Sequence, residues 1–331
     1  MHRIVFVSSK CEGIPLGPAA FQNAFFDFRL LPDGESLLER VSQFNFEQRA
    51  GVAAVVTLLT DNLAGDKLIA LKALLPDLKL IAQYAVGYNN IDISVAKKLG
   101  IAVSNTPGVL GDATADLTLT LILMVARRIF PSALEIHEYG RFAGWSPDYG
   151  LGMDLHGKTL GIVGLGDIGL KVAQRARSFG MNVVALQSLR STTEVDANNE
   201  FARMPEDEFL AVTDVLSLHC PLTPQTRGWL NEHRLKKLKK GAIVVNTARG
   251  DVVDETALAD ALQKEHLFGA GLDVFSGEPV VSEVLRRAPN LLVLPHLGSA
   301  TRETRAAMGR RVIDNIEAFF AGRDLPNLVK S

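Results

Sequence analysis

Residues 159–179 read TLGIVGLGDIGLKVAQRARSF, and this stretch decides the fold. A short apolar run leads directly into GLGDIG at 164–169, which matches the pattern G-x-G-x-x-G, and a helical pattern follows over 170–179. In that context the first glycine permits a tight turn, the second lets a pyrophosphate approach the backbone, and the third lets helix and strand pack closely. The stretch therefore predicts a phosphate-binding turn at a helix N-terminus, whose dipole favours bound phosphate. A glycine-rich turn that binds nothing is the alternative.

Strand-like runs rich in Ile and Val alternate with helical patterns on both sides of this turn. Such alternation predicts parallel sheets joined by crossover helices, so the fold class is α/β with two doubly wound parallel-sheet domains. The second series has six strands, enough for one full dinucleotide-binding sheet. The runs are 3–8, 53–59, 79–82 and 101–104 in the first series, and 159–163, 183–186, 215–218, 242–246, 269–274 and 291–294 in the second.

One helical segment, from Asp112 to about His137, interrupts the alternation and is apolar over most of its circumference. Such a helix lies either in the core or in a subunit interface. The segment 302–321 is an amphipathic helix without a strand, and we expect it to pack on the first sheet. The first domain is then discontinuous: residues 1–103 and 297–331 form it, and residues 104–296 form the dinucleotide-binding domain.

Composition excludes several classes of protein. The chain has 331 residues with 35 Lys and Arg against 37 Asp and Glu, so it lacks the basic surplus typical of nucleic-acid binders. Its two cysteines, Cys11 and Cys220, cannot form a disulfide framework or a usual zinc motif. The N-terminus shows no signal-peptide pattern, and the most apolar run, 117–126, is too short to span a membrane. We expect a cytoplasmic protein that binds neither metal, membrane nor nucleic acid.

The end of the second strand of this sheet bears on cofactor choice. A dinucleotide fold normally places Asp or Glu about 20 residues after the glycine turn, on the ribose hydroxyls. Here Ser188, Leu189 and Arg190 stand at that point, with no acid. A carboxylate would repel a 2′-phosphate, whereas a hydroxyl and a guanidinium accept one. The residues therefore predict a modest preference for NADPH, with NADH also used; the alternative is that Arg190 is merely exposed.

Ionisable residues follow three consecutive predicted strands, where doubly wound sheets bind their ligands. Arg249 follows the first, Asp273 and Glu278 the second, and His296 the third. Each alone has an ordinary structural explanation, but the three positions together beside a dinucleotide site predict hydride transfer to a 2-oxo acid.

Each residue has a role in that chemistry. Arg249 can hold the substrate carboxylate in a bidentate fork. His296 can donate the proton that the forming alkoxide needs. Glu278, if paired with the imidazole, favours its protonated form, and Asp273 is a candidate acceptor for the nicotinamide carboxamide.

The ordered segments GLGDIG, NTARGDVVDE, GLDVFSGEP and PHLGSAT, with AVGYNNID at 85–92 and NTPGVLGDATAD at 105–116, resemble the D-isomer-specific 2-hydroxyacid dehydrogenase family. Within it they are most similar to glyoxylate/hydroxypyruvate reductases. The resemblance implies a Rossmann cofactor domain inserted in a flavodoxin-like substrate domain, a homodimer, and reduction of a small 2-oxo acid.

The resemblance also assigns site residues. The implied catalytic residues are Arg249, Glu278 and His296. The implied substrate contacts are Val86, Gly87, Arg249, His296, Ser299 and Trp145. The implied cofactor contacts are Gly164, Gly166, Asp167, Ile168, Gly169, Ser188, Leu189, Arg190, Pro221, Thr247, Ala248, Arg249, Asp273, His296 and Gly298.

Three positions complicate the resemblance. Many relatives have Arg at Asp167, and reductases that prefer NADP often have Arg at Leu189, so the cofactor preference stays open. Trp145 fits a tryptophan that in some glyoxylate reductases reaches the active site of the partner subunit; the alternative is that it packs only its own loop.

Two other functions remain open from the sequence. The chain could be a family member that acts on phosphoglycerate, phosphite or a bulkier 2-oxo acid, because loops such as 58–60 decide the pocket volume. It could also be an NAD-sensing binding module without activity, although it lacks the long disordered tails expected of one.

Overall fold

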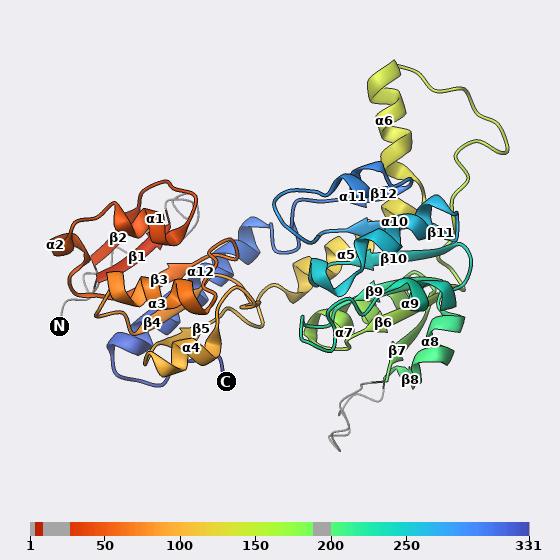
Figure 1. Cartoon of the computed structure of the whole chain (residues 1–331). Helices are drawn as coiled ribbons and strands as arrows, with labels where there is room; N and C mark the ends of the chain where they lie inside the picture. The colour runs from red at the N-terminus through yellow and green to blue at the C-terminus, as the bar shows by residue number, and fades with distance from the viewer. Residues whose placement is uncertain (1–3, 9–26, 188–199, 331) are drawn as a thin grey trace. The chain divides into compact units, whose positions relative to one another are not determined.

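The computed structural model describes residues 4–8, 27–187 and 200–330, and it divides the chain into two compact units (Figure 1). The first unit comprises Met1–Leu110 and Thr301–Ser331, and the second comprises Gly111–Ala300. The chain crosses between units after Leu110 and after Ala300, whereas the sequence analysis placed the crossings after residues 103 and 296.

Hydrogen bonds explain why both crossings lie later in the chain than predicted. The N–H of Asn105 donates to Asn327 O at 3.2 Å and that of Thr106 donates to Ala85 O at 3.0 Å, which ties residues 105–106 to the first unit. Beyond His296, the N–H of Gly298 donates to Asp273 Oδ2 at 2.8 Å, and Thr114 Oγ1 donates to Gly298 O at 3.0 Å. These bonds keep the segment after His296 in the second unit.

The first unit is built on a five-stranded parallel sheet in the order β2-β1-β3-β4-β5. This order is that of flavodoxin-like folds. β2 lies at an edge of the sheet and is missing from the sequence prediction, because DFRLL is only partly buried and carries no long apolar run. The strands are β1 (Ile4–Ser8), β2 (Asp27–Leu31), β3 (Val52–Thr57), β4 (Leu80–Gln83) and β5 (Ala102–Ser104).

Helices cover both faces of this sheet. Alternate residues of β1 point to opposite faces: Val5 and Val7 pack with α12, whereas Ile4 and Phe6 belong to the cluster that contains α3. The C-terminal amphipathic helix therefore packs on the first sheet, as its sequence predicts. The helices are α1 (Leu37–Ser42), α2 (Phe46–Arg49), α3 (Gly65–Leu74), α4 (Ile93–Lys98) and α12 (Arg302–Phe320).

The second unit contains a parallel sheet in the order β12-β11-β10-β9-β6-β7-β8, seven strands rather than the six predicted. The additional strand is β8, a three-residue edge strand whose sequence, ARM, has no strand signal. The strand order reverses between β6 and β9, and such a switch point is where doubly wound sheets bind ligands. The strands are β6 (Thr159–Val163), β7 (Asn182–Leu186), β8 (Ala202–Met204), β9 (Val215–Leu218), β10 (Ala242–Asn246), β11 (Leu267–Leu272) and β12 (Leu291–Val293).

The long helix predicted over 112–137 is two helices, α5 (Gly111–Ala126) and α6 (Ile129–Tyr139), which meet at 67°. The break falls at Arg128, whose φ of 51° lies in the left-handed region. Pro131 explains it, because a proline lacks the N–H needed inside a continuous helix and its ring clashes with the carbonyl four residues earlier. α5 packs in the core of its unit through Leu121 and Ile122.

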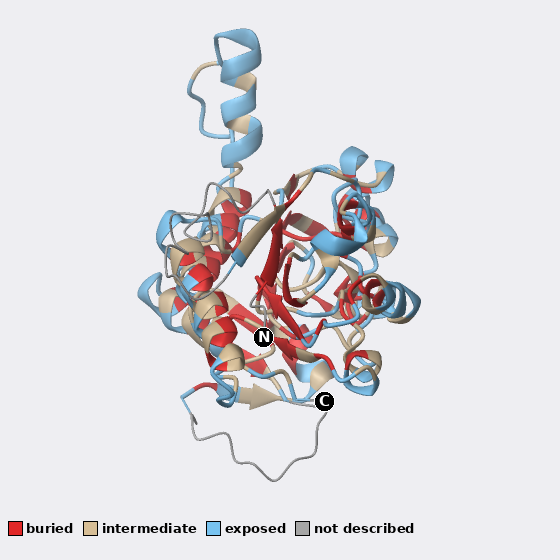
Figure 2. Ribbon diagram, turned by 90° about the vertical axis from the view of Figure 1, so that its left-hand side faces the viewer, coloured by how far each residue is buried: buried red, intermediate tan, exposed pale blue. Residues whose placement is uncertain are grey.

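In contrast to α5, α6 contains no buried residue and stands clear of the rest of its unit (Figure 2). The remaining helices of the unit are α7 (Asp167–Ser178), α8 (Glu206–Val212), α9 (Glu232–Lys237), α10 (Glu255–Gln263) and α11 (Glu283–Arg287), with a 3₁₀ turn at Gly250–Val252. Over the described residues, no single helix is long and apolar enough to cross a membrane; α5 and α6 reach the required length and composition only as a bent pair.

Candidate active site

The glycine turn after β6 has the geometry that a pyrophosphate requires. Gly164 adopts a φ of 96°, and a Cβ there would meet the backbone of His219 and Cys220 at 2.7–2.8 Å. A Cβ on Gly169 would lie 2.2 Å from Gly164 O, so only glycine lets the helix approach the strand this closely.

Gly166 differs from the other two glycines. A Cβ there would meet nothing within 4 Å, and Gly166 is the N-cap of α7 without a side-chain cap. The space beside Gly166 is therefore open, and no Gly166 side chain caps the N-terminus of α7, where a pyrophosphate can bind. The turn fits a dinucleotide. Gly164 and Gly169 have the backbone geometry expected of the first and third glycines, and the contact of Gly166 with a pyrophosphate stays a prediction.

Asp167 and its neighbours form an ion-pair cluster between α7 and α5. Lys171 Nζ lies 3.0 Å from Asp167 Oδ1 and 3.1 Å from Asp112 Oδ2. Arg175 pairs with Asp112 at 2.9 Å and with Asp116 at 2.6 Å. The Asp167 carboxylate is therefore partly neutralised by Lys171.

Arg249 follows β10 in a turn that Asn246 holds. The buried Asn246 side chain donates to Arg249 O at 2.8 Å and accepts from Ala248 N at 3.0 Å. The guanidinium donates to Ala248 O at 2.5 Å, and no carboxylate among the described residues forms an ion pair with it. Burial lowers the pKa of Arg249, and the charge of Glu278 opposes this effect. A largely buried cation with donors to spare can bind a carboxylate.

His296 and Glu278 are paired, as the sequence predicts. His296 Nδ1 lies 2.8 Å from Glu278 Oε2, and Glu278 Oε1 accepts from Phe275 N at 3.1 Å. Both side chains remain about one-third exposed, so solvent or a ligand can reach them. Burial alone would raise the pKa of Glu278, but the hydrogen bond and charge of His296 outweigh it and hold the pKa below its ordinary value. Glu278 is therefore a carboxylate that accepts a hydrogen bond at the His296 ring.

Asp273 holds the turn that carries His296. Its carboxylate accepts from Leu297 N at 2.6 Å and from Gly298 N at 2.8 Å, and its backbone O accepts from His296 N at 3.0 Å. Burial raises the pKa of Asp273, and these two N–H donors oppose the rise. His296 itself has a φ of 57°, a strained conformation for a side chain-bearing residue that this turn maintains. The sequence predicted Asp273 as a nicotinamide contact, and this stays a prediction; each of its oxygens accepts one N–H of the His296 turn and can accept a further donor.

Two carboxylates missed by the sequence analysis fix the loop that carries Glu278. Glu255 Oε1 accepts from Ser276 N at 2.6 Å, and Asp251 Oδ1 accepts from Ser276 Oγ at 2.6 Å. Both acids belong to the segment NTARGDVVDE, directly after Arg249. Because Asp251 and Glu255 lie in the segment NTARGDVVDE, which the sequence analysis had already identified, that segment was the signal from which they could have been predicted.

The exit of β9 contains another residue that the sequence analysis missed. His219 Nε2 lies 2.8 Å from Ser217 Oγ, while its buried Nδ1 has no partner in the described part of the chain. Burial lowers the pKa of His219 to about 3, so the ring is neutral. Burial also raises the pKa of the adjacent Cys220 thiol to about 11, which makes this cysteine unreactive. Pro221, predicted to contact the cofactor, follows directly.

The other predicted residues are distributed over both units. Val86 and Gly87 lie in the first unit, in the turn after β4. Thr247 lies in the second, with Oγ1 2.9 Å from Thr118 Oγ1, as does the half-buried Ser299. Trp145 is 85% exposed and does not pack on its own loop, which contradicts that alternative. Ser188, Leu189 and Arg190 lie outside the described residues.

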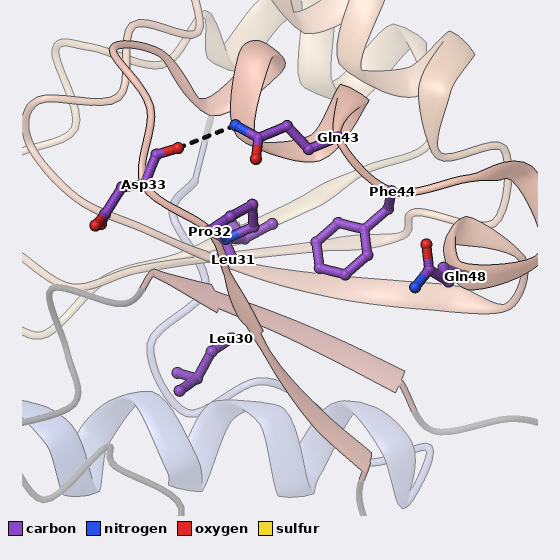
Figure 3. A pocket seen from close by; sticks show the side chains of 7 residues that line it. All are labelled: Leu30, Leu31, Pro32, Asp33, Gln43, Phe44 and Gln48. Carbon is purple, nitrogen blue, oxygen red and sulfur yellow. Dashed lines mark hydrogen bonds between the residues drawn. The ribbon is translucent and has the colours of Figure 1, made fainter.

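A pocket in the first unit contains none of the predicted site residues (Figure 3). It borders the edge strand β2, and Gln43 donates there to Asp33 O at 3.0 Å. Its lining residues are Leu30, Leu31, Pro32, Asp33, Gln43, Phe44 and Gln48.

Comparison with known proteins agrees with this geometry. The NAD-binding domain of D-isomer specific 2-hydroxyacid dehydrogenases matches residues 119–298. A glyoxylate reductase of Thermococcus litoralis is 44% identical over 98% of this chain and 96% of its own length.

Solved structures are similar over the whole chain. The NADPH-dependent glyoxylate/hydroxypyruvate reductase of Sinorhizobium meliloti, solved with NADP and malonate, is 30% identical with a TM-score of 0.82, over 99% of this chain and 97% of that one. The D-lactate dehydrogenase of Aquifex aeolicus, solved with NAD and lactic acid, is 27% identical with a TM-score of 0.82, over 98% of both chains. The chain therefore belongs to the D-isomer-specific 2-hydroxyacid dehydrogenase family.

Proposed function

We propose that this protein is a glyoxylate/hydroxypyruvate reductase, which uses NADPH or NADH to reduce a small 2-oxo acid to the 2-hydroxy acid. The observation that carries the proposal is the His296–Glu278 pair at 2.8 Å, at the same sheet edge as Arg249 and the glycine turn. The relatives named glyoxylate reductase, at 41–44% identity, support glyoxylate as the substrate.

The backbone N–H groups of the Gly166–Gly169 turn would hold the cofactor phosphates. The residues that follow β9 and β10 would line the rest of the cofactor site. A bound dihydronicotinamide supplies the hydride; the chain orients the acid and supplies the proton. Arg249 binds the substrate carboxylate, and its burial strengthens this interaction because the surroundings screen charge less than water does. Val86, Gly87 and Ser299 remain predicted substrate contacts.

His296 gives its proton to the carbonyl oxygen as negative charge develops there. Glu278 keeps the imidazole oriented and stabilises its protonated form, and the two N–H groups bound to Asp273 hold the backbone of His296 in its strained conformation. In the reverse direction the neutral ring accepts the proton of the hydroxy acid.

Cofactor choice is a finer part of the proposal. We expect NADPH to be preferred modestly, because Ser188 and Arg190 can bind a 2′-phosphate and no carboxylate rejects it. Arg190→Ala should lower kcat/KM for NADPH by roughly 10–100-fold, the contribution of a hydrogen bond to a charged group, and spare NADH. Steady-state kinetics with both cofactors measure this. Equal losses would make Arg190 structural, and a wild type that strongly prefers NADH would overturn the preference.

We further propose a cytoplasmic homodimer that associates through α6 and the loop containing Trp145. α6 has no buried residue in the single chain, and Ile129, Phe130, Leu134 and Ile136 are 41–50% exposed along it. Contiguous exposed apolar residues of this kind mark interaction sites. In such a dimer Trp145 would contact the substrate bound by the partner.

The proposal is tested by following NADPH and NADH oxidation with a panel of 2-oxo acids: glyoxylate, hydroxypyruvate, pyruvate and bulkier acids. Glyoxylate or hydroxypyruvate should give the highest kcat/KM, and His296→Ala should lose about 10²–10⁴-fold in turnover while it still binds NADPH. A higher kcat/KM for a bulkier acid would reassign the substrate within the family. Absence of turnover with every acid would favour an NAD-sensing binding module instead.

A further inference from the structure

Three successive carbonyl groups in the turn after β4 are each held by a hydrogen bond. Ala85 O accepts from Thr106 N at 3.0 Å, Val86 O accepts from Asn105 Nδ2 at 2.8 Å, and Gly87 O accepts from Gln83 Nε2 at 3.2 Å. Two of the three donors are side-chain amides from outside the turn. The orientation of this backbone is therefore set by Asn105 and Gln83.

The orientation of each carbonyl fixes that of one N–H group. In a trans peptide the C=O and the following N–H point in opposite directions, and these peptides are trans. The N–H groups of Gly87 and Tyr88 are therefore directed away from Asn105 and Gln83. Neither donates to a protein acceptor within the described residues. Two successive N–H groups without a protein acceptor can together bind an anion.

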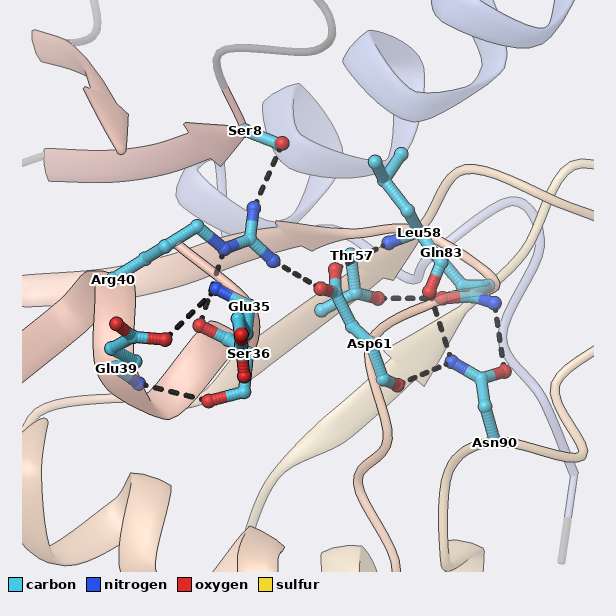
Figure 4. A network of polar contacts seen from close by, with 10 residues as sticks. All are labelled: Ser8, Glu35, Ser36, Glu39, Arg40, Thr57, Leu58, Asp61, Gln83 and Asn90. Atoms are coloured by element: carbon cyan, nitrogen blue, oxygen red, sulfur yellow. Dashed lines mark hydrogen bonds and ion pairs between the residues drawn. The ribbon is translucent and has the colours of Figure 1, made fainter. Parts of the chain in front are cut away.

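The side-chain amide of Gln83 cannot flip without losing hydrogen bonds. Its side chain is fully buried, its Oε1 accepts from Thr57 Oγ1 at 2.6 Å, and its Nε2 donates to Asn90 Oδ1 at 3.0 Å as well as to Gly87 O. The amide oxygen and both amide hydrogens are thus used in one orientation; Figure 4 shows the bonds to Thr57 and Asn90. A flipped amide would turn its oxygen toward the Gly87 carbonyl and the Asn90 amide oxygen.

Behind Gln83, a buried ion pair anchors the neighbouring turn at residues 58–61. Asn90 Nδ2 donates to Leu58 O at 3.0 Å and to Asp61 O at 2.8 Å, and the Asp61 carboxylate accepts from Leu58 N at 2.8 Å and pairs with Arg40. The Arg40 and Asp61 side chains are 5% and 2% exposed. Replacing a buried ion pair by apolar residues of similar volume is often neutral for the stability of a protein. The Arg40–Asp61 pair is therefore better explained by the backbone geometry that it imposes on residues 58–61.

We propose that Gln83 and Asn105 are positioning residues, which orient two peptide planes so that the N–H groups of Gly87 and Tyr88 bind the substrate carboxylate. This inference rests on the proposed function, because the anion that these donors receive is the carboxylate of the 2-oxo acid. Gln83 and Asn105 act through the backbone and need not touch the substrate.

The test replaces each amide separately. Gln83→Met keeps the side-chain volume but removes the donor to Gly87 O, and Asn105→Ala removes the donor to Val86 O. Each should raise the KM for glyoxylate about 10- to 100-fold, the worth of a hydrogen bond to a charged group, with a smaller change in kcat. The Kd of NADPH should not change. A merely structural defect would reduce the active fraction, and with it kcat, without raising KM.

The matched control is Gln43→Met. Gln43 lies in the same unit, and its amide also donates to a backbone carbonyl, that of Asp33 (Figure 3), which is not part of the turn after β4. This variant should have the wild-type KM. Melting temperatures of all variants establish that they are folded, and Asn105→Ala keeps the test decisive if Gln83→Met fails to fold.

Calorimetric titration of the enzyme–NADH complex with oxamate, a carboxylate probe that is not reduced, separates the two proposals. The Kd of oxamate should rise in both variants by the same factor as KM. If the wild type reduces glyoxylate and both variants keep its KM and oxamate Kd, the positioning proposal is wrong and the proposed function stands. If the wild type reduces no 2-oxo acid but the variants weaken oxamate binding, the function is wrong and the positioning proposal is supported.

Discussion

At the residue scale, the sequence predicted the site residues that have ionisable side chains and follow the end of a strand. Arg249, Glu278 and His296 each follow a strand of one sheet, and the predicted contact between Glu278 and His296 is present at 2.8 Å. The supporting partners were not predictable, because Asp273 meets Leu297 and Gly298 across more than 20 residues of sequence. Periodicity and motif spacing carry no information on which distant N–H a carboxylate will accept from.

Glu278→Gln should shift the pH dependence of reduction. The pKa of Glu278 lies below its ordinary value, so at neutral pH it is a carboxylate beside His296. Reduction needs the protonated imidazole, and removal of the negative charge disfavours that form. The alkaline limb of the kcat/KM profile for reduction should therefore move to lower pH.

The matched control for that experiment is Glu283→Gln. Glu283 is an exposed carboxylate on α11 that pairs with Arg287, so its loss should leave the profile unchanged. An unshifted alkaline limb in Glu278→Gln would show that Glu278 only orients the ring.

Arg249→Lys should raise the KM for the oxo acid strongly although the charge is kept. An ammonium group cannot form the two parallel hydrogen bonds of a guanidinium with a carboxylate. Initial-rate kinetics measure the effect, and an unchanged Kd for NADPH serves as the control. A kinetically silent Arg249→Lys would place the carboxylate elsewhere.

At the element scale, the sequence predicted all the central strands and missed two of the four edge strands, β2 and β8. Central strands such as β3 and β10 are wholly buried, so they carry the continuous apolar runs that periodicity detects. The edge strands β2 and β8 are mostly half-exposed, and hydrogen bonds to a single neighbour define them. The break between α5 and α6 was missed because apolar residues lie on both sides of Arg127 and Arg128; Pro131 was the local signal.

The glycine turn and α7 permit a prediction that separates folding from binding. Gly166→Ala places a methyl group in open space, so the melting temperature should change little, while the Kd of NADPH should rise about tenfold because the methyl group occupies the phosphate position. Gly169→Ala places a methyl group against Gly164 O and should cost roughly 1–3 kcal/mol of stability.

Thermal unfolding and NADPH fluorescence titration measure the two effects. Full NADPH affinity in Gly166→Ala would show that the phosphates do not approach this glycine, and an unaltered melting temperature in Gly169→Ala would show that the helix can move away from the strand.

At the scale of the whole molecule, the two α/β units were predictable and their boundaries only approximately so. The two series of strands predicted two sheets, and the C-terminal helix, which has no strand of its own, predicted a discontinuous first unit. The crossings depend on single hydrogen bonds, such as that from Asn105 N to Asn327 O, which join residues more than 200 positions apart. No local pattern encodes such a bond.

The last prediction concerns assembly. Because α6 buries none of its residues in the single chain, Leu134→Arg should leave the fold intact, and any effect must arise from a partner. Burying a leucine contributes about 1.5–3 kcal/mol, and a dimer has this contact on each side, so replacing it with a charge should weaken association at least 100-fold. Light scattering should show a dimer for the wild type and a monomer for Leu134→Arg at micromolar concentration. Ile69→Arg, at an exposed apolar residue of α3, should remain dimeric. A monomeric wild type would rule out α6 as a dimer interface, and a dimeric Leu134→Arg would place the interface on another surface.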